Sequence, residues 1–437
     1  MLSVDRNILA TRTGPDTPCG RLMRQYWQPA ALLDEFEGAR PVRPVKLLGE
    51  HLVAFKDDKG NYGLMQRHCP HRGADLAFGR CEDGGLRCTF HGWLFDTNGR
   101  CIETPAEPEN STLHTRVKSQ AYPTVARSGV LWAWMGKGKP PPLPNLDCFQ
   151  APDSHTFAFK GLWECNWLQA LEVGIDPAHA SFLHRFFEEE DKSTIYGKQF
   201  RDAALDSDIP MTQLLREKAR PEIRIEAAPF GLAITTLRKI DDAKTHVRLT
   251  NQVFPHAICI PLSQEMTITQ WHVPVDDTNC YWYTVFTSFT DPVDKARMRA
   301  DRLKVYELPD YRSKKNSTND YGFDAHDQAI HTYTGMGEDI NVHDQWAVES
   351  QGAIHDRSRE HLGTTDRAIG AYRRLLFKAI DDVENAHAPL FAPASTETAA
   401  ITGPITVDGV SPAATALAYP ADADARRRKS ATWKVSR

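Results

Sequence analysis

The stretch HCPHRGADLAFGRCEDGGLRCTFHGW (residues 68–93) contains a Cys-x-His pair and a Cys-x-x-His pair with sixteen residues between them. The four candidate ligands are Cys69, His71, Cys88 and His91. Glycines surround both pairs, which is typical of two hairpin tips that close over a shared group. Structural zinc sites usually have about two to four residues between paired ligands, so the single residue in Cys-x-His disfavours zinc. A two-iron, two-sulfur cluster with two histidine ligands on one iron fits the four residues better.

Length and composition limit the class of protein. A chain of 437 residues is longer than one hydrophobic core usually organises, so we expect two domains. Apolar residues make up 41% and charged residues 25%, a balance typical of soluble globular proteins. No apolar run approaches the roughly 20 residues that span a bilayer, and the N-terminus lacks a signal-peptide pattern, so we expect a cytoplasmic protein without a membrane partner. The net charge of −5 disfavours nucleic acid as a partner. Nine cysteines, an odd number in a chain that we expect to be cytoplasmic, favour metal binding or burial over disulfides.

The order of local patterns predicts an α+β protein. Short β-prone pieces separated by turn residues run from about residue 40 to 135 and end at a Gly/Pro-rich segment, 136–147. A helical stretch, LWECNWLQALE (162–172), comes next, strand-like stretches follow up to about residue 289, and mostly helical patterns continue to about residue 383. We predict an N-terminal segment and an all-β domain over 1–145, a catalytic α+β domain with an antiparallel sheet flanked by helices over 146–388, and a loosely ordered Ala/Thr/Pro-rich tail over 389–437.

A second group of candidate ligands lies in NWLQALEVGIDPAHASFLH (residues 166–184), which contains Asp176, His179 and His184. On a regular helix the two histidines would point about 140° apart and could not share one metal. Gly174 and the Asp176-Pro177 pair, however, predict a helix end and a new start, which could turn both rings inward. Two histidines with one carboxylate are typical of the facial triad that binds iron(II).

The carboxylate that completes this triad must come from elsewhere in the chain. The stretch GEDINVHDQWAVESQGAIHD (residues 337–356) offers four candidates, namely Asp339, Asp344, Glu349 and Asp356. A charged helix face exposed to water would explain the same residues. The pattern alone therefore leaves the choice of the third ligand open.

The segment CPHRGADL…CTFHGWLFD strongly resembles the Rieske motif, and the two groups together resemble the α subunit of Rieske non-haem iron aromatic-ring-hydroxylating oxygenases. The stretches TPCGRLMRQYW (17–27), YGLMQRHCPHRGADL (62–76) and DRSREHLGTTDRAI (356–369) are most similar to the phthalate dioxygenase branch. The resemblance implies an all-β Rieske domain with a [2Fe–2S] cluster and a catalytic domain with a mononuclear Fe(II). Because HDQWAVES is similar to the helix that carries the third ligand, we choose Asp344 over Glu349 and Asp356.

The resemblance also implies how the two centres communicate. In this family the acid that matches Asp176 hydrogen-bonds a cluster-ligand histidine of the neighbouring subunit, here His91, and the iron-ligand histidine of its own subunit, here His179. The protein is then expected to be a homo-oligomer, a trimer or a stack of two trimers. Electrons are expected from a separate NADH-dependent flavin and iron–sulfur reductase, in line with the lack of a convincing dinucleotide-binding fingerprint in this sequence.

The implied reaction uses O2 to cis-dihydroxylate an aromatic carboxylate, with phthalate or a related benzene dicarboxylate as the first expectation. Arginine forks suit carboxylates, so we expect Arg238, in an otherwise apolar strand, and then Arg201 to bind the substrate. Further possible arginines are Arg216, Arg220, Arg224 and Arg248. Alternatives are a monooxygenase or O-demethylase of a substituted benzoate, an electron carrier that uses the cluster alone and, least favoured, a zinc hydrolase.

Overall fold

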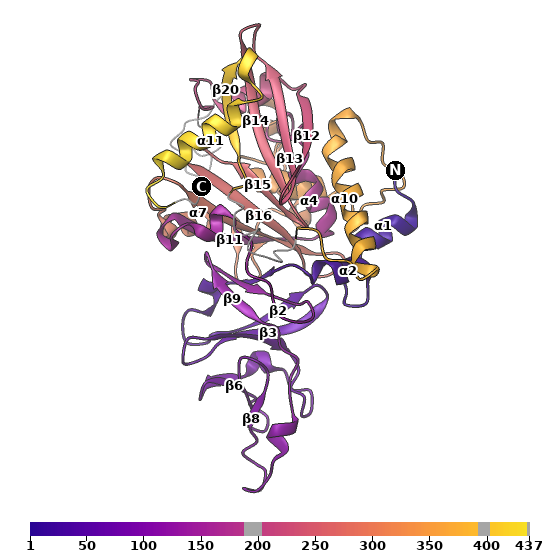
Figure 1. The fold of residues 1–437 in the computed structure, drawn as a ribbon, viewed down its shortest axis with the longest axis vertical. Helices are drawn as coiled ribbons and strands as arrows, with labels where there is room; N and C mark the ends of the chain where they lie inside the picture. The colour runs from indigo at the N-terminus through magenta and orange to yellow at the C-terminus, as the bar shows by residue number, and fades with distance from the viewer. Residues whose placement is uncertain (188–202, 392–402, 435–437) are drawn as a thin grey trace.

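The computed structural model describes residues 1–187, 203–391 and 403–434 of the chain. Figure 1 shows a slender lower part made of short strands, which carries the Cys/His stretch, and a larger upper part built around a long twisted sheet with helices beside it. The lower part corresponds to the expected Rieske domain and the upper part to the expected catalytic domain. The expected α+β fold class is confirmed.

Three small antiparallel sheets form the expected Rieske domain. They have the strand orders β1-β10-β9, β2-β3-β4 and β5-β6-β7-β8. Their strands are β1 (Gln28–Leu32), β2 (Val42–Leu47), β3 (Glu50–Lys56), β4 (Tyr62–Gln66), β5 (Arg80–Glu82), β6 (Gly85–Arg87), β7 (Leu94–Phe95), β8 (Cys101–Glu103), β9 (Thr124–Arg127) and β10 (Val130–Ala133). The last sheet lies at the lower end of the molecule, away from the catalytic sheet (Figure 1).

A ten-stranded sheet forms the centre of the catalytic domain. Its order is β12-β13-β14-β15-β16-β17-β11-β19-β18, with β20 paired to β14 beside this path. Its strands are β11 (Thr156–Trp163), β12 (Glu222–Ala228), β13 (Gly231–Lys239), β14 (Lys244–Val253), β15 (Ala257–Pro261), β16 (Met266–Pro274), β17 (Cys280–Ser288), β18 (Tyr306–Glu307), β19 (Arg312–Ser313) and β20 (Val407–Pro412). All pairs are antiparallel except β11 with β19. Because alternate side chains of a strand face opposite sides of the sheet, β13, β14, β15, β16 and β17 line the pocket described below from one face of the sheet.

The helices are α1 (Val4–Thr11), α2 (Pro18–Met23), α3 (Asp147–Gln150), α4 (Trp167–Gly174), α6 (Met211–Glu217), α7 (Lys295–Val305), α8 (Ala325–Ile330), α9 (Ile340–Glu349), α10 (Arg367–Glu384) and α11 (Tyr419–Ser430). Asn166 caps α4 and Asp339 caps α9, each through its side-chain oxygen. The buried residues of α10 recur every three or four positions, for example Ile369, Tyr372 and Leu376, so one face of this helix packs on the core.

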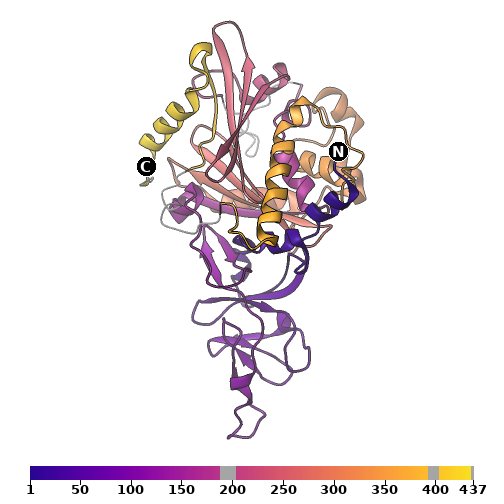
Figure 2. The same ribbon diagram turned by 45° about the vertical axis from the view of Figure 1, so that its right-hand side comes forward.

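The two domains share one hydrophobic core that extends from the N-terminal helices through β1 and β10 into the catalytic sheet. A buried ion pair between Lys160 on β11 and Glu35 joins the domains at this interface. Helices α1 and α2 lie beside α10 in both ribbon views (Figures 1 and 2), and Arg21 on α2 pairs with Glu384 on α10. The first 23 residues therefore pack against the catalytic domain.

The expectation of a loosely ordered tail is wrong for residues 403–434. Strand β20 pairs antiparallel with β14 over Lys244–Leu249, where β15 leaves the edge of β14 free. Helix α11 follows, and the ring of Trp433 stacks on Phe289. Composition suggested disorder, but this segment is ordered because β20 pairs with the open edge of β14 and Trp433 packs on the catalytic domain.

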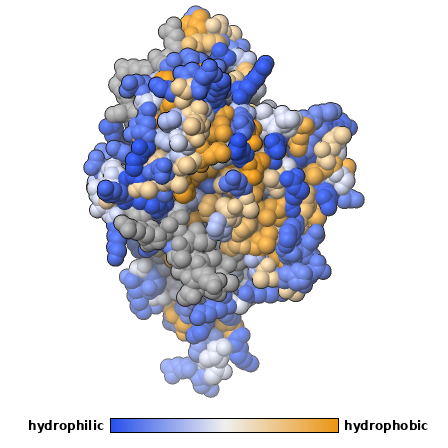
Figure 3. All heavy atoms as spheres, turned by 45° about the horizontal axis from the view of Figure 1, so that its top comes forward, coloured by the Kyte–Doolittle hydropathy of each residue, from blue (hydrophilic) through white to orange (hydrophobic). Residues whose placement is uncertain are grey.

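No helix among residues 1–187, 203–391 and 403–434 is long and apolar enough to cross a lipid bilayer. On the face shown in Figure 3, hydrophilic side chains cover most of the lower end of the molecule, whereas hydrophobic side chains gather in a band over the catalytic domain.

Candidate metal centres

The Cys/His stretch forms two matching hairpin tips. The Gly73 amide donates to the Cys69 carbonyl at 2.8 Å, and the Gly92 amide donates to the Cys88 carbonyl at 3.0 Å. Both glycines have positive φ, 74° and 76°, which other L-residues rarely adopt. Cys69 and Cys88 are each only 3% exposed. Each tip is thus closed by a main-chain hydrogen bond, and its cysteine is shielded from solvent.

The two histidines of these tips also face each other. The His71 and His91 ring centroids are 4.5 Å apart, and Trp93 stacks on His71 with an interplanar angle of 8°. Nδ1 of His91 is buried and has no hydrogen-bond partner among the described residues. Burial, together with nearby Cys88, raises the pKa of Cys69 to about 11, so a bound metal is what would favour the thiolate. Two cysteines, two histidines and an unsatisfied ring nitrogen fit a [2Fe–2S] cluster of the Rieske type.

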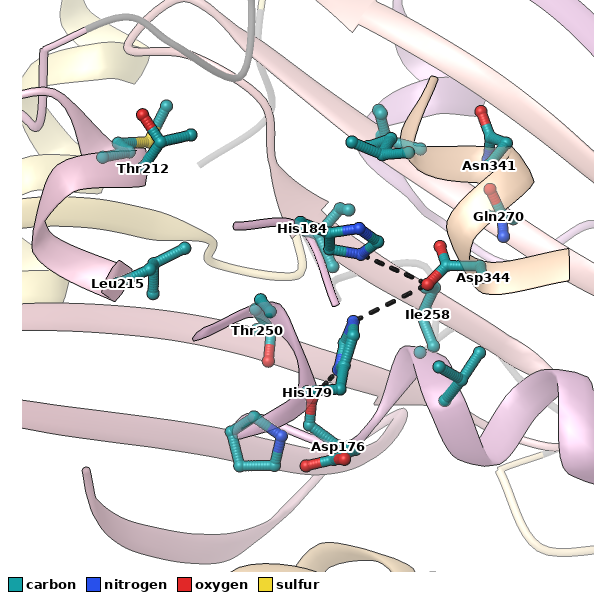
Figure 4. A pocket seen from close by; sticks show the side chains of 18 of the residues that line it. Asp176, His179, His184, Thr212, Leu215, Thr250, Ile258, Gln270, Asn341 and Asp344 are labelled. Carbon is teal, nitrogen blue, oxygen red and sulfur yellow. Dashed lines mark hydrogen bonds and ion pairs between the residues drawn. The ribbon is translucent and has the colours of Figure 1, made fainter. Parts of the chain in front are cut away.

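The second group converges from two separate elements (Figure 4). Helix α4 ends at Gly174, and His179 begins a short 3-10 turn, so the chain breaks where the sequence predicted. His184 Nε2 lies 3.2 Å and His179 Nε2 lies 3.9 Å from Oδ1 of Asp344, which α9 carries. The three ligand atoms all lie within 4.8 Å of one another.

The electrostatic environment of these three residues suits a divalent metal. Burial lowers the pKa of His179, which favours the neutral imidazole that metals bind. Burial works against the Asp344 carboxylate, but His184 and His179 outweigh it and hold the pKa of Asp344 below its usual value. Asp344 Oδ1 is buried and makes no regular hydrogen bond within the described residues, despite its close approach to His184. Two imidazoles and one carboxylate with an unsatisfied oxygen fit an iron(II) facial triad.

The other three candidate acids of this region are engaged elsewhere. Glu349 accepts hydrogen bonds from the Glu164 amide and the Tyr321 hydroxyl. Asp339 caps α9 and pairs with a buried arginine, and exposed Asp356 caps the amide of the residue two positions later. Among the four candidates, the structure therefore brings only Asp344 to the two histidines.

Asp176 lies beside His179 in a different way from the one the resemblance implied. Its main-chain oxygen is 2.6 Å from His179 Nδ1, whereas its carboxylate accepts a hydrogen bond from the Ala178 amide. The expected carboxylate bond to His179 is thus replaced by a main-chain one. Asp176 lines both the cavity beside the three candidate iron ligands and a second, wider groove.

A cavity of about 150 Å³ adjoins the three candidate iron ligands. Its lining includes the apolar side chains Val173, Ile258, Ile260, Ile268, Trp282 and Phe286. Polar groups of the lining include Thr250 and Gln270, which Figure 4 shows on different sides of the triad. A largely apolar cavity with a few fixed polar groups is suited to a small aromatic ligand.

Of the two arginines favoured from the sequence, Arg238 does not line this cavity. Arg201 lies outside the described residues. Arg238 is 1% exposed and donates to the main-chain oxygens of Lys218 and Pro177 and to the hydroxyl of Thr236. Burial lowers the pKa of Arg238 to about 10, and its donors serve the protein itself. We therefore correct the expectation for Arg238, because its side chain is committed to structural hydrogen bonds.

Arg248, one of the other possible arginines, does line the cavity. It lies opposite Thr236 in the β13–β14 pairing, on the same strand as Thr250. Within the described residues its side chain hydrogen-bonds only to Asp408, through Nη1. The same carboxylate lies 2.9 Å from Nε2 of buried His246. The C-terminal strand β20 thus supplies a buried acid to an arginine of the cavity wall.

His343 and Asp408 are the residues that the sequence analysis missed. Nδ1 of His343 is 3.4 Å from Nδ1 of His184, and Nε2 of His343 is 2.7 Å from the oxygen of Gly337. Burial lowers the pKa of His343 to about 4, so its ring is neutral at physiological pH. Its position directly before Asp344 was a signal that could have identified it. No local signal marked Asp408, because its role depends on the pairing of β20.

Comparison with known proteins agrees with this arrangement. Residues 26–123 match the Rieske [2Fe-2S] domain, and residues 133–402 match the family described as LigXa C-terminal domain like. The chain belongs to the Rieske non-haem iron oxygenases. Such oxygenases bind a [2Fe–2S] cluster in the Rieske domain and a mononuclear iron in the catalytic domain, and they receive electrons from separate reductase or ferredoxin components. Strand β20 and helix α11 follow the matched residues.

Relatives of this Rieske oxygenase differ in their reactions. The phthalate 4,5-dioxygenase oxygenase subunit of Pseudomonas putida is 33% identical over 87% of this chain and 86% of its own length. The 5,5'-dehydrodivanillate O-demethylase oxygenase subunit of Sphingobium sp. is 31% identical over 89% of this chain and 83% of its own. The solved structure of dicamba monooxygenase bound to dicamba has a TM-score of 0.55 at 18% identity and covers 83% of this chain and 99% of that one, which shows the shared fold.

Proposed function

We propose that this Rieske oxygenase acts on an aromatic carboxylate, using O2 and electrons from a separate NADH-dependent flavin and iron–sulfur reductase. The observation that carries the proposal is the cavity that joins the candidate iron ligands to Arg248. An apolar wall suits the aromatic ring, and a partly buried arginine suits the carboxylate. The first candidate reaction is cis-dihydroxylation of phthalate or a related benzene dicarboxylate.

In this proposal Cys69, His71, Cys88 and His91 hold the cluster, and His179, His184 and Asp344 hold the iron. Bound iron would supply oxygen activation beside the ring, and the cluster would supply single electrons. The protein's own part is to orient the substrate. Nε and Nη2 of Arg248 have no hydrogen-bond partner among the described residues, so they can bind a carboxylate while Asp408 holds Nη1. Residues such as Trp282 and Phe286 would exclude water around the ring.

Transfer between subunits forms a second part of the proposal. A groove of about 1050 Å³ is lined by Asp176 and His179 and by several exposed aromatic side chains: Phe182, Phe323, Tyr333 and Trp346. The Rieske tip carries exposed Phe90 next to His91. The cluster tips of the same chain lie in the lower part of the molecule, whereas α4, which leads to His179, lies in the upper part (Figure 1). We propose that a second copy docks its tip in this groove, in a trimer or stacked trimers, with Asp176 between the centres.

O-demethylation of a substituted benzoate is the second candidate. It is favoured by the O-demethylase relative, which matches 89% of this chain. The same cavity and Arg248 would hold a methoxylated ring, with the methyl group rather than two ring carbons next to the iron ligands.

Product mass distinguishes the two reactions. The iron-loaded protein is incubated with a suitable reductase, NADH, O2 and a panel of phthalate, 3-chlorobenzoate and methoxybenzoates. Gain of two oxygens and two hydrogens by a dicarboxylate would establish dihydroxylation. Release of formaldehyde from a methoxybenzoate would establish demethylation. If no acid in the panel reacts although the cluster is reduced, the proposed substrate class is wrong.

A further inference from the structure

We propose that His343 is a positioning residue that sets the tautomer and orientation of His184, and that the main-chain oxygen of Gly337 sets His343 in turn. The inference rests on the proposed assignment of His179, His184 and Asp344 as the iron ligands. It adds a second contribution from α9, which carries both His343 and Asp344.

In the hydrogen-bond chain of His184, His343 and Gly337, each donor can be assigned. The Gly337 oxygen can only accept, so Nε2 of His343, 2.7 Å away, must carry the proton. In a neutral imidazole the other nitrogen then accepts, so Nδ1 of His343 accepts from Nδ1 of His184 at 3.4 Å. A proton on Nδ1 of His184 leaves a lone pair on its Nε2. That nitrogen lies 3.2 Å from Asp344 Oδ1, where the iron ligands converge.

Helix α9 holds His184 from two sides. Consecutive helical residues point about 100° apart, so His343 and Asp344 reach His184 in different directions. Asp344 approaches Nε2, while the ring of His343 lies 5.6 Å from the ring of His184 at an interplanar angle of 22°. His343 is fully buried, so water does not compete for its Nδ1. The other candidate ligand, His179, has a different partner, the main-chain oxygen of Asp176.

Gly337 fits its role in this chain through its backbone. Its φ is +78°, in the left-handed region that other residues enter only with strain. Its amide also donates to Oδ2 of Asp327 at 3.2 Å. Replacing the glycine would therefore shift the carbonyl that accepts from His343, although Gly337 itself touches none of the three candidate iron ligands.

The test measures metal affinity rather than turnover. Protein that keeps its Rieske cluster but is depleted of mononuclear iron is titrated with Co(II), and binding is followed by the visible absorption of the metal. Partners that orient a ligand histidine typically contribute about 10- to 100-fold in metal affinity. We expect His343→Leu to weaken Co(II) binding by that factor, with an unchanged cluster spectrum. His343→Gln, whose amide oxygen can accept from Nδ1 of His184, should recover most of the affinity, and Gly337→Ala should show a smaller loss of several-fold.

His256→Gln is the matched control, because His256 is also fully buried but hydrogen-bonds Gln28 away from the triad. It should leave Co(II) affinity unchanged. Wild-type affinity and absorption in His343→Leu would overturn the inference, as would a His343→Gln variant no better than His343→Leu. If His343→Leu does not fold, the comparison of His343→Gln, Gly337→Ala and wild type decides, and wild-type affinity in Gly337→Ala overturns the role of its carbonyl. Asp344→Asn tests the underlying assignment, since unchanged Co(II) binding there would show that the iron ligands themselves are wrong.

Discussion

Nδ1 of His179 lies 2.6 Å from the main-chain oxygen of Asp176, and the Asp176 carboxylate points to the Ala178 amide instead. The main chain alone can therefore orient His179. Asp176 also lines the groove in which we propose that a second subunit docks. The main-chain oxygen of Asp176 thus orients His179, and the carboxylate is the group that we propose for electron transfer.

Asp176→Asn should leave both metal centres occupied, because the amide oxygen can still accept from Ala178. Reoxidation of the reduced cluster in a single turnover should slow by roughly 100-fold if the carboxylate bridges the subunits. Stopped-flow absorbance of the cluster measures this rate. Asp241→Asn is the control, since Asp241 caps Ala243 in the same way in an exposed turn. Normal reoxidation in Asp176→Asn would rule out the bridge.

Asp344→Asn should remove the mononuclear iron and spare the cluster. Metal analysis should then find about two irons per chain instead of three, with an unchanged cluster spectrum. Glu349→Gln should keep all three irons, because Glu349 accepts hydrogen bonds from Glu164 and Tyr321 and does not reach the triad. Loss of iron from Glu349→Gln with retention in Asp344→Asn would reverse the assignment of the third ligand.

Arg248 should determine recognition of the carboxylate. The double variant Arg248→Gln/Asp408→Asn is compared with Asp408→Asn, so that no buried acid is left unpaired in either protein. The double variant should raise the KM for a carboxylate substrate by about 10- to 100-fold, the effect of losing a charged hydrogen bond of ~1.5–3 kcal/mol. The corresponding carboxamide should show no such change. Equal losses for acid and amide would exclude Arg248 as the anion-binding group.

Arg238→Gln should mainly reduce stability. It would leave the carbonyls of Pro177 and Lys218 without their buried donor, at a cost of about 2–4 kcal/mol in the free energy of unfolding. Chemical denaturation measures that loss. The ratio of KM values for acid and amide should stay close to that of wild type, and a carboxylate-specific rise would restore Arg238 as the substrate anchor.

Asp408 should make the stability of the C-terminal strand depend on pH. Burial opposes its ionisation, but His246 and Arg248 outweigh burial and hold the pKa of Asp408 well below the usual value. A lowered folded-state pKa stabilises the protein above the unfolded-state pKa of about 3.9, and this contribution declines as the pH falls below it. The Tm difference between wild type and Asp408→Asn should thus be largest above about pH 5 and shrink below about pH 4. A difference that stays constant from neutral to acid pH would contradict the ion pairs.

The sequence predicted best the features that depend on neighbouring residues. Both halves of the Cys/His motif lie within 68–93, and the break after Gly174 follows from local helix signals. The third ligand was harder, because 337–356 offered four candidate acids and only the packing of α9 distinguishes them. Arg238 was misjudged for a related reason. An arginine in an apolar strand needs partners, but the sequence does not reveal that main-chain oxygens of distant residues provide them.

The C-terminal segment shows the limit of composition as a guide. Its residues are rich in alanine, threonine and proline, which suggested a loose tail. Strand β20 nevertheless pairs with six residues of β14, from Lys244 to Leu249, and places Asp408 against Arg248. Long-range pairing of this kind depends on which strand edge is open, and this is a property of the finished sheet.

The Rieske domain is attached to the catalytic domain at both of its ends. Helices α1 and α2 precede it and pack beside α10, while the chain that leaves β10 leads through α3 into β11. A domain tethered at entry and exit does not swing on a single hinge. Its cluster should therefore keep a constant distance from the iron of its own chain, and a higher solvent viscosity should hardly slow electron transfer. Dilution of the protein until the subunits separate should, in contrast, stop electron transfer.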